Sequence, residues 1–443
     1  MGSPSRDEHN GKILDTDSLD ISKARSVPLS TPPAPSTEPS SEESAPDGGT
    51  LAWLQVIGCF FVLLNTWGII NAFGAYQGFY EIHLLRSHTP SAISWIGSIQ
   101  GYLLFLVSAL TGPFFDAGFN RALLAIGSFL IFFSIMMTSL VKQYYQAFLA
   151  QGVCFGIGAG MLFVPSIAVV STYFDKYRSF SVGVGVTGSS LGGVIYPTLF
   201  HSLQPRIGFG WATRVIAFIA LVTLGIANLV MRQRLLPSTR RKLIDVSALR
   251  EAPFVFCTAG LFFGFIALYV PFFYITPYAL FKTGASATLA FYFVPIINAG
   301  SVFGRVFPNA LADHIGTLNT LIPCTLACGV IAFSWMSVDD TGDLLVFAIL
   351  YGFFSGSFVS LAPTTIVSLS NDLHKVGTRL GMSFSISGFG ILIGTPVAGT
   401  LLNIHTGKFV HAQVFCAACM MVSCVCLVLA RFAKTGPAVM IKT

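Results

Sequence analysis

The chain of 443 residues is 53% hydrophobic and only 10% charged, and its mean hydropathy is +0.73. This balance excludes a soluble globular domain, because apolar runs of about 20 residues recur to the end of the sequence. The net charge of +6 does not indicate nucleic-acid binding, since much of the excess lies in one short loop at residues 232–251.

The first 47 residues are the exception to this composition. The stretch "SVPLSTPPAPSTEPSSEESAPDGG" is rich in Pro, Ser and Glu and holds few residues that could form a core. We therefore expect a disordered tail, either a regulatory segment with phosphorylatable serines or a passive one. The tail contains no basic stretch followed by an apolar run, so no cleavable signal peptide is expected.

Apolar windows of about 20 residues predict twelve membrane-spanning helices after this tail. The predicted spans are residues 53–77, 92–114, 121–141, 145–171, 180–202, 209–231, 254–279, 286–309, 318–337, 344–369, 380–403 and 411–431. The predicted organisation is a tail (1–47), a six-helix half (48–231), a basic linker (232–252), a second six-helix half (253–432) and a short tail (433–443).

The distribution of Lys and Arg over the loops predicts the orientation. With the N-terminus inside, cytoplasmic loops hold more than twice as many cations as exterior loops, and the positive-inside rule then places both termini in the cytosol. The cytoplasmic set is Arg121, Lys176, Arg178, Arg232, Arg234, Arg240, Arg241, Lys242, Arg250, Lys375 and Arg379; the exterior set is Arg86, Lys142, Arg206, Lys282 and Lys408. The basic linker is also expected to contact anionic membrane lipid.

The two halves resemble each other at an offset near 200 residues. "GIGAG" from Gly156 matches "GFFSG" from Gly352, Asp116 corresponds to Asp313, and Arg178 corresponds to Arg379. A six-plus-six repeat with a cytoplasmic linker is the layout of transporters that rock two halves about a central site. Glycines in the fifth and eleventh spans indicate close packing of moving helices, with oligomer packing as the alternative.

Chemistry on the protein is not expected. The cluster Cys416, Cys419, Cys424 and Cys426 lies in an apolar run without His or carboxylate neighbours, which favours packing over a metal site. No HExxH, GxSxG or acid pair at membrane depth is present, so a membrane-embedded enzyme is disfavoured. We predict no catalytic residue, no metal and no cofactor.

The loop after the second span resembles the cytoplasmic gating motif of the major facilitator superfamily. Gly112, Asp116 and Arg121 stand where that motif expects them, whereas Ala117 replaces its usual arginine. The resemblance implies an all-α integral membrane protein with the major facilitator fold, twelve helices in two halves. The predicted gating residues are Asp116, Arg121, Lys176, Arg178 and Asp313.

Within that superfamily the chain looks like the monocarboxylate porter family. "DGGTLAW" (residues 47–53) resembles the family motif before the first span, and "YFDKYRSFSVGVGVTGSSLGG" (residues 173–193) resembles the motif at the fifth. "GFGWATR", with Arg214, looks like the fungal branch. Arg305 falls on the family's substrate-binding arginine, which implies that it holds an anionic group of the substrate.

The departures from that family concern proton coupling. The aspartate of lactate-type members, four residues before the arginine, is Ser301 here, and a lysine of the first span falls on Asn71. Every acid beyond the tail lies at a predicted span end or in a loop, and the histidines lie outside the span centres. Since proton-coupled carriers place such a group in the membrane interior, a lactate–proton symporter is disfavoured.

Arg305 is the only charge between Lys282 and Asp313. It either faces a central cavity and binds substrate, or snorkels to the cytoplasmic end and pairs with Asp313. Polar residues at membrane depth are further candidates, because they need a partner or a wet cavity. The predicted substrate-binding residues are Arg305, Asn298, Asn71, Asn65, Gln100 and Tyr274; Tyr269 and Tyr278 are further candidates, each of which could be an interfacial belt residue.

The leading functional hypothesis is a secondary transporter of a small organic molecule with carboxylate or heterocyclic character, working by alternating access. The resemblance implies a range from vitamin or monocarboxylate uptake to export of fungal secondary metabolites. A nutrient receptor that has lost transport is an alternative, although the tail and the linker are short for one. We expect a plasma-membrane protein that acts as a monomer on a small-molecule substrate.

Overall fold

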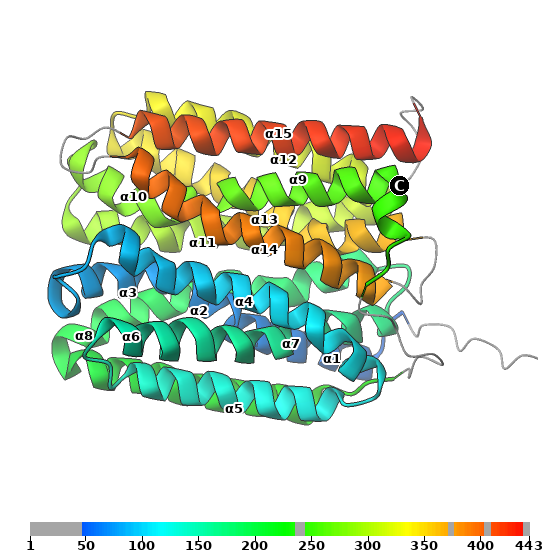
Figure 1. The fold of residues 1–443 in the computed structure, drawn as a ribbon, viewed down its shortest axis with the longest axis horizontal. Coiled ribbons are helices and arrows are strands. Elements are labelled where there is room, and N and C mark those ends of the chain that lie inside the picture. Colours follow the sequence, from blue (N-terminus) through cyan, green and yellow to red (C-terminus); the bar gives the residue numbers. More distant parts are fainter. Residues whose placement is uncertain (1–46, 235–243, 371–375, 403–408, 437–443) are drawn as a thin grey trace, which may run out of the picture. The chain divides into compact units, whose positions relative to one another are not determined.

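The computed structural model describes residues 47–234, 244–370, 376–402 and 409–436, except the side chains of Pro90 and Asp116. These residues belong to one compact unit, Ala45–Thr443. The predicted disordered tail lies outside the described residues apart from Asp47, as do the centre of the basic linker and most of the C-terminal tail. All regular elements of the described ranges are helices (Figure 1).

The first half contains the interrupted first span and four further spans. Its first span consists of α1 (Thr50–Asn65), α2 (Trp67–Asn71), α3 (Phe73–Phe79) and the π-helical η1 (Tyr80–Leu84). The others are α4 (Pro90–Asp116), α5 (Asn120–Thr138), α6 (Tyr144–Ala147) continued by η2 (Phe148–Cys154) and α7 (Phe155–Tyr173), and α8 (Arg178–Val230).

The second half repeats this plan. A short turn, η3 (Ala248–Arg250), leads into α9 (Ala252–Leu268) and α10 (Val270–Phe281), which form one span. The remaining elements are α11 (Ala287–Ile315), α12 (Thr317–Ser334) with η4 (Trp335–Ser337), α13 (Thr341–Leu369), α14 (Val376–Leu401) and α15 (Val410–Thr435).

Eleven helices of the described part are long and apolar enough to cross a membrane. The difference from the twelve predicted spans lies in α8, whose 53 residues contain Gly208 at φ 79° and ψ 165°. This left-handed backbone is available to glycine at little cost, so the chain turns there between the predicted spans 180–202 and 209–231. Several helices also end later than predicted: the first span continues to Leu84 rather than 77, α11 to Ile315 rather than 309, and α15 to Thr435, past the predicted limit at residue 432.

The GxxxG pairs bring helices of the same half together, as the sequence predicts. A β-carbon at Gly160 would lie 2.9 Å from the backbone oxygen of Leu104 on α4, and one at Gly356 would lie 2.7 Å from that of Ser301 on α11. Neither contact leaves room for a side chain, so α7 packs on α4 and α13 packs on α11 at equivalent places in the two halves.

Two helix pairs join the halves, each through contacts at several depths. Helix α8 contacts α11 from Ser179–Asp313, through Ser190–Ser301, to His201–Phe291. Helix α4 contacts α14 from Ala109–Gly381, through Phe105–Phe384, to Ser98–Thr395. We call the two extremes the Asp313 end and the His201 end. Both pairs are in contact at both extremes, so the two halves are closed against each other at each end, and we call this arrangement occluded.

Candidate functional site

Arg305 lies inside the protein, on the face of α11 that meets α8 of the other half. Its side chain is 5% exposed, and Nη1 lies 3.4 Å from the backbone oxygen of Val186. Its Nε is buried without a hydrogen-bond partner among the described groups, and no described carboxylate forms an ion pair with it. The guanidinium therefore neither snorkels to the surface nor pairs with Asp313; the sequence left this arrangement open as the alternative to an arginine that faces a central cavity.

Two predicted asparagines, Asn71 and Asn298, form a hydrogen bond about two turns of α11 before Arg305. The amide nitrogen of Asn71 donates to Oδ1 of Asn298 over 3.2 Å, and Asn298 in turn donates to the backbone oxygen of Val294. Asn71 belongs to α2 and Asn298 to α11, so this bond crosses the interface between the halves. Gly193 of α8 lies against Asn298, and a β-carbon there would sit 2.3 Å from Oδ1.

Ser301 completes a polar strip along this face of α11. Its hydroxyl lies 2.6 Å from the hydroxyl of Ser190 on α8, and both residues are buried. Asn298, Ser301 and Arg305 are spaced at three and four residues, so they share one side of the helix. The structure thus gathers three polar groups of α11 and Asn71 of α2 between the halves.

The other predicted substrate-binding residues lie elsewhere. Asn65 braces α1 within the first half, where it accepts from the hydroxyl of Tyr196 over 2.6 Å and donates to Thr223 over 2.7 Å. Gln100 is fully buried, and neither amide atom has a partner among the described groups. The hydroxyl of Tyr274 donates to the backbone oxygen of Thr395 over 2.9 Å.

The three tyrosines of the seventh predicted span are not belt residues. Tyr269, Tyr274 and Tyr278 are 6%, 6% and 2% exposed, whereas a belt at the lipid interface requires accessible rings. Tyr278 packs against Trp335 and Phe409 and donates to the backbone oxygen of Val338, so it has a structural role.

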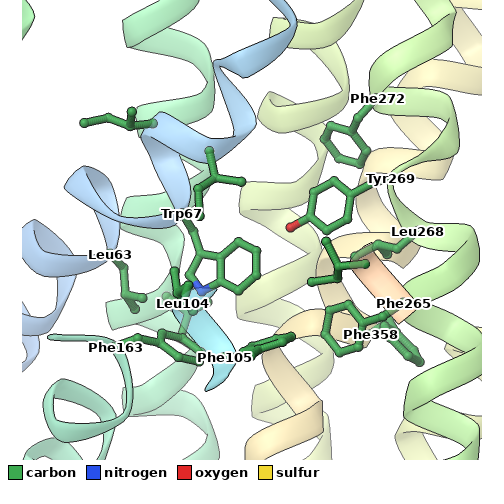
Figure 2. Packing of buried hydrophobic residues seen from close by; sticks show 14 of the residues in the cluster. Leu63, Trp67, Leu104, Phe105, Phe163, Phe265, Leu268, Tyr269, Phe272 and Phe358 are labelled. Carbon is green, nitrogen blue, oxygen red and sulfur yellow. The ribbon is translucent and has the colours of Figure 1, made fainter. Parts of the chain in front are cut away.

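Aromatic side chains fill the centre between the halves (Figure 2). Trp67 contacts Phe105 and Phe163 edge-on at centroid distances of 5.2 and 5.7 Å, and Phe105 lies nearly parallel to Phe384 at 4.8 Å. Sequence reasoning missed Trp67. The signal that could have found it is its position between Asn65 and Asn71, at the repeat offset from Tyr269.

The predicted gating residue Asp313 joins the halves at the Asp313 end. Its two carboxylate oxygens accept from the backbone amides of Ser179 and Phe180, at 3.1 and 2.9 Å. These amides belong to the first turn of α8, where a carboxylate is stabilised by the unsatisfied N–H groups and the helix dipole. The end of α11 is thus attached to the beginning of α8.

Lys176 and Arg178 lie with Asp313 around one cavity of about 820 Å³ between the α7–α8 loop, α11 and α13. Arg178 pairs with Asp175 at 2.9 Å. Arg121 is exposed and lies elsewhere, and the side chain of Asp116 is outside the described part. The structure therefore brings together three of the five predicted gating residues.

The two sequence signatures at residues 47–53 and 173–193 contact each other. The carboxylate of Asp47 accepts from the backbone amides of Asp175 and Lys176 at 2.6 and 2.9 Å, and the amide of Asp47 donates to Tyr173. Asp47 has φ 49°, a left-handed conformation that aspartate tolerates better than most residues. The start of the first span is thus fixed to the α7–α8 loop.

In the second half, an ion-pair cluster fixes the segment before α9 to the start of α14. The guanidinium of Arg379, at the start of α14, binds Glu251 at 2.5 Å and Asp245 at 3.2 Å, both ahead of α9. Because Arg379 and Asp245 are largely buried, we expect this cluster to hold the linker firmly against α14. In the described ranges no group of three or more His, Cys, Asp or Glu side chains could hold a metal ion.

Comparison with known proteins identifies the family. Residues 56–343 match the Major Facilitator Superfamily. The chain belongs to that superfamily. An MFS-type transporter of Emericella nidulans, dbaD, is 48% identical over 81% of this chain and 80% of its own length. The aspyridones efflux protein apdF of the same organism is 38% identical over 88% of this chain and 78% of its own length.

The fold also matches solved structures. The crystal structure of the human organic anion transporter MFSD10 superposes with a TM-score of 0.64, at 18% identity, over 86% of this chain and 100% of that one. At this identity the likeness shows the fold alone. The all-helical fold and the family together make this protein a multipass secondary transporter of a small molecule, as the sequence predicts.

Proposed function

We propose that this chain exports an anionic organic metabolite, and that Arg305 holds the anionic group of the substrate between the two halves. The observation that carries the proposal is the burial of Arg305 without an acidic partner in the described ranges. A buried charge that lacks a counterion is costly, so it persists where a ligand supplies the opposite charge. The planar fork of the guanidinium suits a carboxylate or an acidic enol oxygen.

The polar strip on α11 orients the rest of the ligand. Asn71 and Asn298 are joined to each other across the interface in the occluded state, and their amides become available when the halves separate. Amides can both donate and accept, so they suit the carbonyl and hydroxyl oxygens of an oxygenated metabolite.

The gating residues support alternating access. The Asp313 end opens when Asp313 leaves the amides of Ser179 and Phe180, and the His201 end opens when Ser98 separates from Thr395. Because the two ends are held by separate contacts, one can open while the other stays closed. Asp116 and Arg121 are assigned a gating role by their position in the superfamily motif alone.

The direction and the family branch rest on the relatives and the motifs. A relative at 38% identity is named as an aspyridones efflux protein, which favours export over uptake for this chain. The contact between Asp47 and the α7–α8 loop links the two signatures that resemble the monocarboxylate porter family, and supports placing the chain in that branch. We place it in the plasma membrane, as a monomer with cytosolic termini and a lipid-facing basic linker.

The proposal is tested with purified protein in proteoliposomes and a panel of lactate, pyruvate, riboflavin and an aromatic carboxylic acid. We expect outward flux of the aromatic acid that Arg305→Gln reduces to background. Arg214→Gln is the matched control, because Arg214 is half-buried on α8 and bonds Ser139 within the first half. Equal flux in wild type and Arg305→Gln would refute the role of Arg305, and flux of uncharged riboflavin alone would refute an anionic substrate.

A further inference from the structure

Trp67 and Tyr269 occupy equivalent positions at interruptions of the first span of each half. Trp67 follows Thr66, whose φ of −95° and ψ of −84° separate α1 from α2. Tyr269 stands between α9 and α10, 202 residues later, within the offset of the repeat. Each half therefore places one large aromatic side chain where its first helix is broken, and such breaks mark binding sites in transporters.

The two rings meet across the interface between the halves. Their centroids lie 6.2 Å apart and their planes are within 5° of parallel. Figure 2 shows the two rings side by side in face view, with the hydroxyl of Tyr269 directed toward the indole. The pair thus brings together two nearly parallel aromatic rings, one from each half.

The indole N–H of Trp67 has no hydrogen-bond acceptor among the described groups around this pair. Trp67 is 3% exposed, and its Nε1 is buried with no hydrogen-bond partner among the described groups. The side chains labelled around it in Figure 2, Leu104, Phe105 and Phe163, are apolar. A buried donor without an acceptor is unfavourable, so an oxygen supplied by a ligand would stabilise this position.

Movement of the halves makes the same pair of rings available. Since Trp67 and Tyr269 belong to different halves, alternating access must separate them and expose both rings to the opened cavity. Exposed aromatic faces favour a ligand that covers them again, and a conjugated ring does this best because it adds offset stacking to apolar burial.

We propose that Trp67 and Tyr269 form a paired aromatic subsite that binds a planar, conjugated, oxygen-bearing ring of the substrate, with the indole N–H of Trp67 donating to a ring oxygen. The inference rests on the proposed function, since it assigns a second part of the same substrate. Arg305 and Tyr269 are both buried, and each contacts a residue of the first half, Val186 and Trp67 respectively, so both face the interface between the halves. The substrate class is an aromatic acid, or an acidic molecule with a conjugated ring that bears oxygen.

The experiment measures binding of 2-naphthoate and of octanoate to the purified full-length protein. Both probes carry one carboxylate, and only the first carries a conjugated ring. We expect wild type to prefer 2-naphthoate, and Trp67→Leu to weaken 2-naphthoate by about tenfold while leaving octanoate unchanged. We expect wild type to bind 6-hydroxy-2-naphthoate more tightly than 2-naphthoate, because the indole N–H can donate to the ring hydroxyl oxygen. Trp67→Phe retains a ring but has no N–H, so we expect it to lose only this difference in affinity.

The matched control is Trp335→Leu. Trp335 is 1% exposed, its Nε1 likewise lacks a partner in the described part, and it stacks on Phe347 within the second half, away from the interface. We expect it to leave the ratio of the two affinities unchanged.

The outcomes separate this inference from the proposed function. Loss of both probes in Arg305→Gln, with selective loss of 2-naphthoate in Trp67→Leu, supports both. Selective loss in Trp67→Leu with no effect of Arg305→Gln refutes the anion site and supports the aromatic subsite. The aromatic subsite is overturned if Trp67→Leu leaves the ratio of the 2-naphthoate affinity to the octanoate affinity unchanged. It is also overturned if wild type does not bind 2-naphthoate.

Discussion

Individual residues decide which ion, if any, the carrier can use. Ser301 lies four positions before Arg305 on the same face of α11, and its hydroxyl contacts Ser190 rather than a charged group. A carboxylate at this position would stand one helical turn from the guanidinium and would pair with it. The wild-type residue cannot take up a proton at physiological pH, so coupling at this position is absent.

Restoring an acid at this position should create a dependence on pH. In Ser301→Asp the carboxylate competes with the substrate for Arg305, and protonation releases the guanidinium, so flux should rise as pH falls, by up to about tenfold per pH unit. Ser301→Asn has nearly the same size and no titratable group, and its flux should follow the wild-type pH profile. The measurement is proteoliposome flux between pH 5 and 8; identical profiles for Asp and Asn would contradict the prediction.

For single residues, the sequence predicted which polar side chains at membrane depth are candidates for the site, but it did not predict which groups each of them contacts. Asn71, Asn298 and Arg305 were chosen because polar groups at membrane depth need a partner or a cavity, and all three lie between the halves. Asn65 and Tyr274 satisfy the same criterion through Tyr196 and Thr395 instead. One sequence cannot separate these cases, because the difference depends on which helix each side chain faces.

Helix ends carry the contacts that differ between conformations. The attachment of Asp313 to the first turn of α8 combines capping with a favourable helix-dipole interaction, which together stabilise the closed Asp313 end by about 1 kcal/mol. The sequence predicted a gating role for Asp313 from the repeat. It did not predict the partner, since backbone amides carry no sequence signature.

Asp313→Asn should loosen the Asp313 end. A loss of about 1 kcal/mol raises the ratio of open to closed forms about fivefold, so the amides of Ser179 and Phe180 should exchange hydrogen faster by that factor. Hydrogen exchange followed by mass spectrometry of the α8 peptide is the measurement. Asp343→Asn is the control, because Asp343 lies in the first turn of α13. Unchanged exchange at the start of α8 would mean that other contacts hold this end.

The hydrophobic pattern of the sequence predicts the fold of the whole molecule more directly than it predicts any of its sites. Spans of about 20 apolar residues, their repeat near 200 residues and the glycine pairs were sufficient to predict two similar halves with close helix packing. The occluded arrangement was beyond the sequence, because the same residues must also form the open states. Such states differ by only a few kcal/mol in contacts between the halves.

A disulfide between the halves should stop transport reversibly. The hydroxyl oxygens of Ser98 and Thr395 lie 3.0 Å apart at the His201 end, a separation that two cysteines can bridge. We expect oxidation of the Ser98→Cys, Thr395→Cys variant to reduce flux to background, and reduction to restore it.

The control pair lies within one half. Thr258 of α9 and Ser383 of α14 have hydroxyls 3.1 Å apart, and both helices belong to the second half. Oxidation of Thr258→Cys, Ser383→Cys should leave flux intact. Equal inhibition of the two variants would show that rigidity within a half, rather than separation of the halves, limits transport.

The solitary charge of Arg305 also has an electrical consequence. If Arg305 binds the anion as proposed, the empty carrier holds a positive charge in this interface that no described residue neutralises, whereas the carrier loaded with a monovalent anion is neutral there. In a cell whose interior is 100 mV negative, moving one charge across the full field is worth about 2.3 kcal/mol. For the export that we propose, the inward return of the empty carrier would be the voltage-driven step, and we expect the membrane potential alone to power it without a proton gradient.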